Sequence, residues 1–163
     1  GGNVALLLAA DRPEKVKKVA VFAAASHTSA YYSWATEGLD QLTPEAVEAN
    51  FQWWLKSHLQ KSPQPSKWRK FISDFSAMCA TPVIIPEAKL ESIKTRILIV
   101  QGDNDIVRPE HSVALYQAIK GSQLCIIPAA SHFILFEKPD LLAQIAMEFF
   151  NKEPNLFDWT KLG

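Results

Sequence analysis

Cysteine is scarce in this sequence, and no residue pattern in it favours a metal site. Two cysteines in 163 residues, Cys79 and Cys125, are too few for a disulfide framework. Their apolar neighbours predict that both are buried, free thiols. We expect His58 on a polar helix face and His111 in the first turn of a helix. Neither has a metal-ligating partner at ligand spacing, so we expect no metal site.

The sequence also lacks an excess of either charge and a long apolar run. Lys plus Arg equals Asp plus Glu at 17 each, which argues against nucleic acid or an anionic membrane as a partner. No apolar run approaches the ~18 residues that a membrane span needs. A small, neutral molecule fits this composition better as a substrate or partner.

The chain begins with GGNVALLLAA, which contains neither an initiating methionine nor a basic leader. We therefore expect the sequence to begin in the middle of a longer protein. We expect a cytoplasmic location, although the missing leader carries no information about location if the sequence begins within a longer protein.

What remains is the composition of a globular domain built on a parallel sheet. Hydrophobic residues make up 48% of the chain and charged residues 21%, which is enough for a substantial core. Apolar, β-branched runs alternate with segments of helical periodicity, and this alternation predicts a parallel sheet with helices on both faces. The predicted elements are a helix at 2–11, a strand at 16–25, a strand at 96–102, a helix at 109–120, a strand at 123–130 and a helix at 139–150. The last helix carries one apolar stripe that we expect to lie against the sheet, formed by Leu141, Leu142, Ile145, Ala146, Phe149 and Phe150.

A segment between about residues 26 and 94 interrupts this alternation and holds most of the aromatic residues. Thr43 followed by Pro44 is typical of a helix start and predicts a helix over 44–60. A turn rich in proline and serine then precedes a second predicted helix at 66–79. We interpret this segment as a helical insertion into the α/β pattern.

Acidic and basic side chains follow the carboxyl ends of two predicted strands. Asp103 and Asp105 come directly after the strand at 96–102, and His132 comes just after the strand at 123–130. Strands joined by a helix are usually neighbours, and parallel sheets bind ligands outside their carboxyl ends. A carboxylate beside a histidine holds the imidazole in one tautomer, as a general base requires.

Three segments of the chain resemble the C-terminal half of an α/β-hydrolase. The opening GGNVALLLAADRPEKVKKVAVFAA resembles the segment that follows the nucleophile elbow. LESIKTRILIVQGDNDIVRPEHS resembles the acid strand and its turn, with the pattern G-x-x-D-x-x-x-P at Gly102, Asp105 and Pro109. PAASHFILFEKPDLLAQIAMEFF resembles the histidine loop and final helix. The resemblance implies the C-terminal part of an α/β-hydrolase fold, with three mainly parallel strands, flanking helices and a helical cap insertion. The implied domains are a core at 1–26 and 92–152, a cap at 27–91 and a tail at 153–163.

By this resemblance, Asp105 takes the place of the catalytic acid and His132 that of the catalytic base. The order acid before histidine, with the nucleophile earlier, is that of the family. Asp103 becomes a turn acid that bonds nearby backbone amides. Gly1 would be the second glycine of the elbow G-x-S-x-G, so the nucleophile would precede residue 1 and the chain alone would be inactive. Ser131 stands where the family usually has glycine, and we do not expect it to be a nucleophile.

The resemblance further implies hydrolysis of an ester or related acyl bond in a small, apolar substrate, without a cofactor. His27 ends the first predicted strand, and Trp34, Trp53 and Trp54 lie in the aromatic-rich segment. These four residues are candidates for substrate contact, although aromatic residues at helical spacing more often pack against one another.

Two alternatives stay open at the level of sequence. An upstream aspartate could be the nucleophile, as in the epoxide hydrolases and haloalkane dehalogenases that share this scaffold. The chain could instead be a non-catalytic fragment or interaction module. In that case the strand at 16–25 would form an open sheet edge, and we expect self-association through it.

Overall fold

The computed structural model describes residues 1–154 and divides the chain into two compact units. The first comprises Gly1–Ser26 and the described residues from Ile85 onward, and the second is His27–Ile84. The second unit contains most of the segment predicted as a cap, and that role stays a prediction. Most of the tail predicted at 153–163 lies outside the described residues.

The first unit is built on a three-stranded parallel sheet. Its strands are β1 (Lys18–Phe22), β2 (Arg96–Asn104) and β3 (Gln123–Ser131), in the order β1-β2-β3. Both strand pairs are parallel, so all three carboxyl ends lie at one edge of the sheet. The predicted α/β class, and the prediction that the second and third strands are neighbours, are confirmed.

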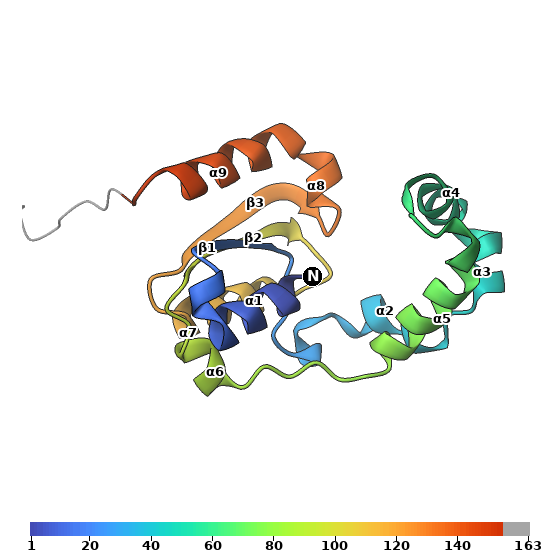
Figure 1. The fold of residues 1–163 in the computed structure, drawn as a ribbon, viewed down its shortest axis with the longest axis horizontal. Coiled ribbons are helices and arrows are strands. Elements are labelled where there is room, and N and C mark those ends of the chain that lie inside the picture. Colours follow the sequence, from blue (N-terminus) through green and yellow to red (C-terminus); the bar gives the residue numbers. More distant parts are fainter. Residues whose placement is uncertain (155–163) are drawn as a thin grey trace, which may run out of the picture. The chain divides into compact units, whose positions relative to one another are not determined.

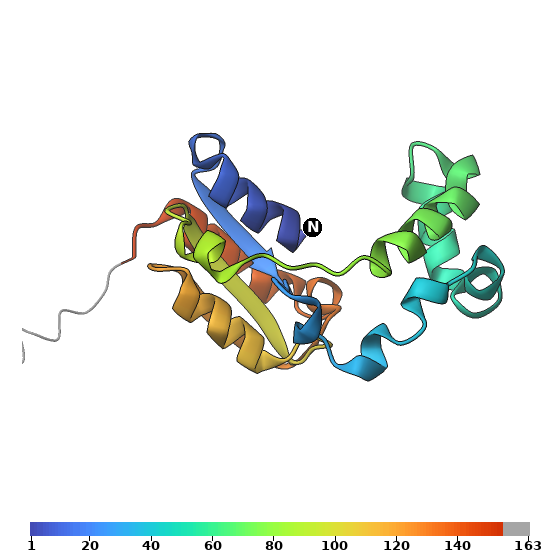
Figure 2. The same ribbon diagram turned by 90° about the horizontal axis from the view of Figure 1, so that it is seen from below.

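Helices cover both faces of this sheet. Helices α1 (Gly2–Asp11) and α7 (Pro109–Ala118) lie on one face, and α9 (Pro139–Asn151) lies on the other (Figures 1 and 2). The central strand β2 contributes side chains to the hydrophobic core on each face of the sheet, because its side chains alternate between the two faces. Ile97 and Ile99 join the core with α1 and α7, whereas Leu98 and Val100 join the core with α9. Each such fully buried side chain stabilises the fold by about 1.5–3 kcal/mol.

The outer elements are less buried than the sequence pattern predicts. Val19 and Val21 of β1 are buried, but the alternate residues of this strand are only half-buried. Helix α1 lies over this end strand, and its Val4 is 68% exposed. In α9, Leu142 and Phe149 are buried, whereas the neighbouring Leu141 and Phe150 of the predicted apolar stripe are largely exposed. A sheet of three described strands covers only part of each flanking helix.

Several short elements were not predicted, because one turn of helix leaves little periodicity in a sequence. The first unit contains the 3₁₀ turn η1 (Pro13–Lys15) and the helices α6 (Glu87–Glu91) and α8 (Ile134–Glu137). In the second unit, the short elements are η2 (Thr28–Ala30), α2 (Ser33–Thr36), η3 (Leu39–Gln41) and η4 (Pro65–Lys67).

The second unit consists of helices that pack around a small aromatic core. Its longest helices are α3 (Pro44–Asn50), α4 (Gln52–Lys61) and α5 (Trp68–Cys79), with Trp68 buried beside Val47 and Ile72. The prediction of one helix over 44–60 is wrong. Phe51 leaves the helical region with φ −127° and ψ 50°, and this break lets both α3 and α4 pack against α5.

Cys79 and Cys125 are free thiols and are half-buried rather than fully buried. Partial burial raises the pKa of both thiols, and the charge of Asp40 adds to the effect at Cys79. Within residues 1–154, the structure contains no helix with the length and apolar character needed to cross a membrane.

Self-association is the outcome we expect for the isolated chain, because β1 has a strand neighbour on only one side within the described residues. Size-exclusion chromatography with light scattering at micromolar concentration should give a mass above the 18.2 kDa of the monomer. Amide hydrogen exchange should slow in Lys18–Phe22 as concentration rises, while the central strand β2 serves as the internal control. A stable monomer with concentration-independent exchange would contradict this expectation.

Candidate active site

The candidate site lies where β2 and β3 end. The pairing of these strands continues as far as Asn104 and Ser131, after an irregularity that follows Gly102. Asp105 and His132 are the residues that directly follow the two strands. The parallel register therefore delivers an acid and a histidine to the same edge of the sheet from positions 27 residues apart.

Gly102 permits the close approach of the two strand ends. A Cβ atom at this position would lie 2.1 Å from the carbonyl oxygen of Ala130, far inside van der Waals contact. Ala129, on the same segment of β3, adopts the left-handed region with φ 51°, which is costly for a residue other than glycine. Gly102 and the left-handed Ala129 therefore bring the backbone before His132 close to the turn that carries Asp105.

Asp105 and His132 form a direct hydrogen bond. The Nδ1 atom of His132 lies 2.8 Å from Oδ1 of Asp105, whose side chain is fully buried, whereas the His132 side chain is 36% exposed. A carboxylate can only accept hydrogen bonds, so Nδ1 carries the proton in this pair. Nε2 of the neutral imidazole is then the basic nitrogen, as general-base chemistry requires.

The two oxygens of the Asp105 carboxylate have different surroundings. Oδ1 also accepts a hydrogen bond from the backbone N–H of Val107, at 3.0 Å. Oδ2 is buried and has no hydrogen-bond partner within the described part of the chain. Both bonds that orient the carboxylate therefore end on one oxygen atom.

Asp103 connects the acid turn to the opposite strand. Its Oδ1 accepts a hydrogen bond from the backbone N–H of Ala130 at 3.3 Å. The amides of Ala130 and Ala129 lower the pKa of Asp103, because they stabilise its ionised form. Asp103 thus bonds backbone amides as predicted; the amides of β3 lower its pKa most, and the amides of Asp103 and Asn104 in its own turn add a smaller effect.

Ser131 and Glu137 clamp the loop that carries His132, an interaction that sequence reasoning missed. The Glu137 carboxylate accepts hydrogen bonds from the backbone N–H of Ser131 at 2.7 Å and from its hydroxyl at 2.6 Å. The Ser131 hydroxyl oxygen in turn accepts from the N–H of Phe133, at 3.1 Å. The bonds from Ser131 lower the pKa of Glu137, its hydroxyl contributing most. The replacement of the family's glycine by serine was the available signal.

The structure places the other predicted contact residues in the second unit. His27 accepts a hydrogen bond from the backbone N–H of Ser29 through Nδ1, at 3.0 Å. Trp54 packs edge-on against Phe75, with ring centroids 5.2 Å apart. Trp34 and Trp53 are 66% and 59% exposed, and their contact with a substrate stays a prediction.

The surroundings of His58 differ from those predicted from the sequence. We predicted that it occupies a polar helix face, but its Nε2 atom is buried and its ring lies 4.9 Å from that of Phe71. His111 accepts a hydrogen bond from the backbone N–H of Ser26, at 2.9 Å. Among the residues that the structure describes, no group of three or more histidine, cysteine or acidic side chains is arranged to hold a metal ion.

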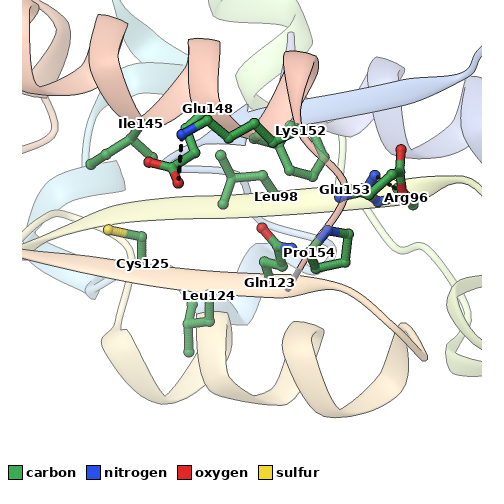
Figure 3. A pocket seen from close by; sticks show the side chains of 11 residues that line it. Arg96, Leu98, Gln123, Leu124, Cys125, Ile145, Glu148, Lys152, Glu153 and Pro154 are labelled. Atoms are coloured by element: carbon green, nitrogen blue, oxygen red, sulfur yellow. Dashed lines mark hydrogen bonds and ion pairs between the residues drawn. The ribbon is translucent and has the colours of Figure 1, made fainter. Parts of the chain in front are cut away.

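A hollow also lies between α9 and the first halves of β2 and β3 (Figure 3). It is at the amino-terminal end of the sheet, and neither Asp105 nor His132 lines it. Parallel sheets bind ligands at the opposite end, so we assign no catalytic site to this hollow. Its lining includes Leu98, Leu124, Cys125 and Ile145, with the ion pairs Arg96–Glu153 and Lys152–Glu148.

Replacing Gly102 by alanine tests the close approach of the two strand ends. The added methyl group would overlap the Ala130 carbonyl, so we expect the free energy of unfolding in urea to fall by about 1–3 kcal/mol. Gly1→Ala is the matched control, because a Cβ there meets nothing within 4 Å. Equal stability of the two variants would contradict the prediction.

Replacing Glu137 by glutamine tests the clamp on the histidine loop. The pKa of Glu137 is lowered in the fold, from about 4.3 in an unfolded chain. A lowered pKa stabilises the fold above the unfolded value, and the effect is lost as pH falls through the folded value. We therefore expect Glu137→Gln to be less stable than the wild type near neutral pH, and the difference to shrink below about pH 4.3.

Urea midpoints measured across this pH range would follow the effect of Glu137→Gln. Glu148→Gln is a suitable control for loss of one negative charge, because Glu148 is exposed and pairs with Lys152 on the surface of α9. A difference between the Glu137 variant and the wild type that stays constant with pH would contradict the role of the charged clamp.

Comparison with known proteins gives a consistent assignment of the fold. No family model and no curated protein matches the sequence, but many solved structures match the chain. MGS-M2, an alpha/beta hydrolase enzyme from a Medee basin deep-sea metagenome library, is 19% identical with a TM-score of 0.70. The match covers 97% of this chain and 64% of that protein.

Two further structures have similar coverage. The enol-lactonase from Burkholderia xenovorans LB400 is 19% identical with a TM-score of 0.63, over 93% of this chain and 62% of its own. A serine hydrolase involved in carbazole degradation, the CarC enzyme, is 16% identical with a TM-score of 0.63, over 91% of this chain and 59% of its own. The chain thus spans about three fifths of the length of these proteins, and it has the C-terminal portion of the α/β-hydrolase fold.

Proposed function

We propose that this chain supplies the acid and the base of a serine-type α/β-hydrolase that cleaves an ester or related acyl bond. His132 would take a proton from a serine hydroxyl and return it to the leaving group. Asp105 would hold the imidazole and stabilise the imidazolium that forms. The reaction needs no cofactor. The observation that carries the proposal is the hydrogen bond between His132 Nδ1 and the fully buried carboxylate of Asp105.

Burial favours this role for Asp105 over that of a surface turn residue. Removing a carboxylate from water is costly unless it is paired, and here the pairing partner is the imidazole. His132 is partly exposed, so its second nitrogen remains accessible to a reacting group. Placement at the carboxyl ends of parallel strands agrees with the usual position of sites in open α/β sheets.

The nucleophile is proposed to lie upstream of Gly1, at the elbow whose last glycine Gly1 would be. Gly2 supports this alignment. It begins α1 directly beside the end of β1, and a Cβ at Gly2 would lie 2.5 Å from Cβ of Ala24. Glycine at this position permits the start of the helix to pack closely against the segment that follows β1. The isolated chain would then be inactive, because it would hold an acid and a base without a nucleophile.

A small, apolar substrate is proposed from the aromatic content of the second unit. Trp34 and Trp53 have large exposed aromatic surfaces, whereas the ring of Trp54 packs against its aromatic neighbours. Apolar and aromatic side chains with few polar groups are typical of small-molecule sites. Of the four predicted contact residues, Trp34 and Trp53 are therefore the best placed to meet a ligand.

An aspartate nucleophile is the second candidate. It uses the same histidine and the same fold, and differs only in the residue at the elbow. A non-catalytic interaction module is the third, and the open side of β1 is the feature in its favour. A buried acid paired with a histidine has no evident use in such a module, so we rank it last.

Reaction of the natural gene product with a fluorophosphonate, followed by intact mass spectrometry, tests the proposal. An activated serine should add one phosphonate, and digestion should place it upstream of Gly1. His132→Ala should lower the rate of labelling by about 10⁴-fold or more, and Asp105→Asn by about 10³–10⁴-fold. Glu148→Gln is the control for loss of one carboxylate, because Glu148 is exposed and pairs with Lys152 on the surface of α9.

Each alternative has a distinct result in this experiment. Labelling that His132→Ala leaves unchanged would overturn the proposed base. A full-length protein that resists the fluorophosphonate but forms an ester with an epoxide or haloalkane would support the aspartate nucleophile. Absence of both reactions in the full-length protein would favour the interaction module.

A further inference from the structure

The central strand β2 carries a buried polar side chain that the proposed chemistry does not yet use. Gln101 follows four buried apolar residues of β2 and is itself 0% exposed. Burial of an amide costs free energy unless both its donor and its acceptor are bonded. An apolar residue would satisfy packing at this position without that cost, so the amide requires an explanation.

Both ends of the Gln101 amide are bonded within the first unit. Its Nε2 donates to the backbone carbonyl of Val107, and its Oε1 accepts from the hydroxyl of Ser112. Ser112 belongs to α7 and is 1% exposed. The Val107 carbonyl fixes which way round the amide lies, because a carbonyl only accepts and so must face the amide nitrogen, which leaves the amide oxygen to the Ser112 hydroxyl.

The bonds of Gln101 lead directly to the candidate acid. Val107, whose carbonyl receives the Gln101 amide, donates its own N–H to Oδ1 of Asp105 at 3.0 Å. The same Oδ1 binds Nδ1 of His132 at 2.8 Å. A continuous chain of hydrogen bonds thus runs from Ser112 through Gln101, Val107 and Asp105 to the imidazole.

We propose that Gln101, whose amide oxygen is anchored by Ser112, is a positioning residue that fixes the Asp105 carboxylate for its bond to His132. Its catalytic consequence rests on the proposed function, but its structural consequence does not. Gln101 does not touch the imidazole. It acts by holding Val107, whose N–H is the donor that sets the rotation of the carboxylate.

The surroundings of the second carboxylate oxygen explain why Asp105 needs a positioning residue. Oδ2 of Asp105 is buried and has no partner within residues 1–154, so nothing described on that side resists rotation of the carboxylate. A buried acceptor without a hydrogen bond costs free energy, and this cost favours rotation of the carboxylate toward any available donor. The Val107 N–H opposes this rotation only while Val107 itself is held, and Gln101 holds it.

The tautomer of His132 is the direct readout, and it can be measured in the 163-residue chain without any nucleophile. Imidazole ¹⁵N chemical shifts, recorded at alkaline pH, distinguish the Nδ1–H from the Nε2–H form. The carboxylate bond favours Nδ1–H in the wild type. In Gln101→Met, which keeps the volume and loses the amide, the Nδ1–H population should fall toward that of an unrestrained imidazole.

Two further variants separate positioning from stability. Ser112→Ala removes the bond that anchors the amide oxygen and should shift the tautomer in the same direction by a smaller amount. Ser122→Ala is the matched control, because its buried hydroxyl bonds the Tyr116 carbonyl at 3.1 Å and is not connected to Asp105. This control should lower stability without changing the tautomer.

Activity of the natural gene product provides the second readout. For Gln101→Met we expect kcat to fall about 10- to 100-fold with KM little changed, as for a misplaced catalytic group. Ser122→Ala should leave both constants near the wild-type values at a temperature well below unfolding.

The outcomes distinguish this inference from the proposed function. An unchanged tautomer in both Gln101→Met and Ser112→Ala would overturn the positioning role, whether or not the enzyme is a hydrolase. If these variants shift the tautomer but the gene product has no hydrolase activity, the result would support the positioning role of Gln101 and reject the proposed function. If the wild type itself lacks the Nδ1–H form, both proposals fail.

Discussion

The parallel pairing of β2 with β3 is the constraint from which the candidate site follows. It places two turns, separated by a whole helix in the sequence, side by side at one edge of the sheet. Gly102 lets the backbones approach so closely that a single methyl group would collide with the Ala130 carbonyl. Because this contact is between backbone atoms, rotation of a side chain cannot relieve it, and the geometry of the acid and histidine depends on it.

Three carboxylates near this edge have different tasks because their surroundings differ. Asp103 bonds a backbone amide of the opposite strand, and Glu137 bonds the amide and hydroxyl of Ser131. Donors of this kind stabilise the ionised form and fix the loops in place. Asp105 alone bonds the imidazole, and it is fully buried. Two acids therefore shape the frame that holds the third against His132.

The interactions that define this frame are local to one stretch of the chain. Hydrogen bonds of Gln101 and Ser112 hold the acid turn in place, and hydrogen bonds between Ser131 and Glu137 hold the histidine loop. None of these bonds involves the helical unit at 27–84. The proposed acid and base are therefore held in place by bonds within the first unit alone.

Much of the fold could be predicted from sequence, because apolar periodicity depends on neighbouring residues. The three strands and the helices at 2–11, 109–120 and 139–150 were expected within a few residues of their observed bounds. The break at Phe51 was not, because the reason for it is the packing of two helices on a third. The exposure of Leu141 and Phe150 was missed for a similar reason: periodicity gives a helix face, and the width of the sheet decides how much of it is covered.

For the candidate site, the sequence by itself determined that an acid and a histidine follow successive strand ends, because strand order and chain order agree in a right-handed parallel sheet. It could not determine which oxygen of Asp105 is bonded, or that Gln101, Ser112 and Glu137 support the pair. These facts depend on hydrogen bonds between residues whose spacing has no period, formed only when the strands lie in register. Tertiary structure alone decided them, because a buried polar group must find its partner in space rather than along the chain.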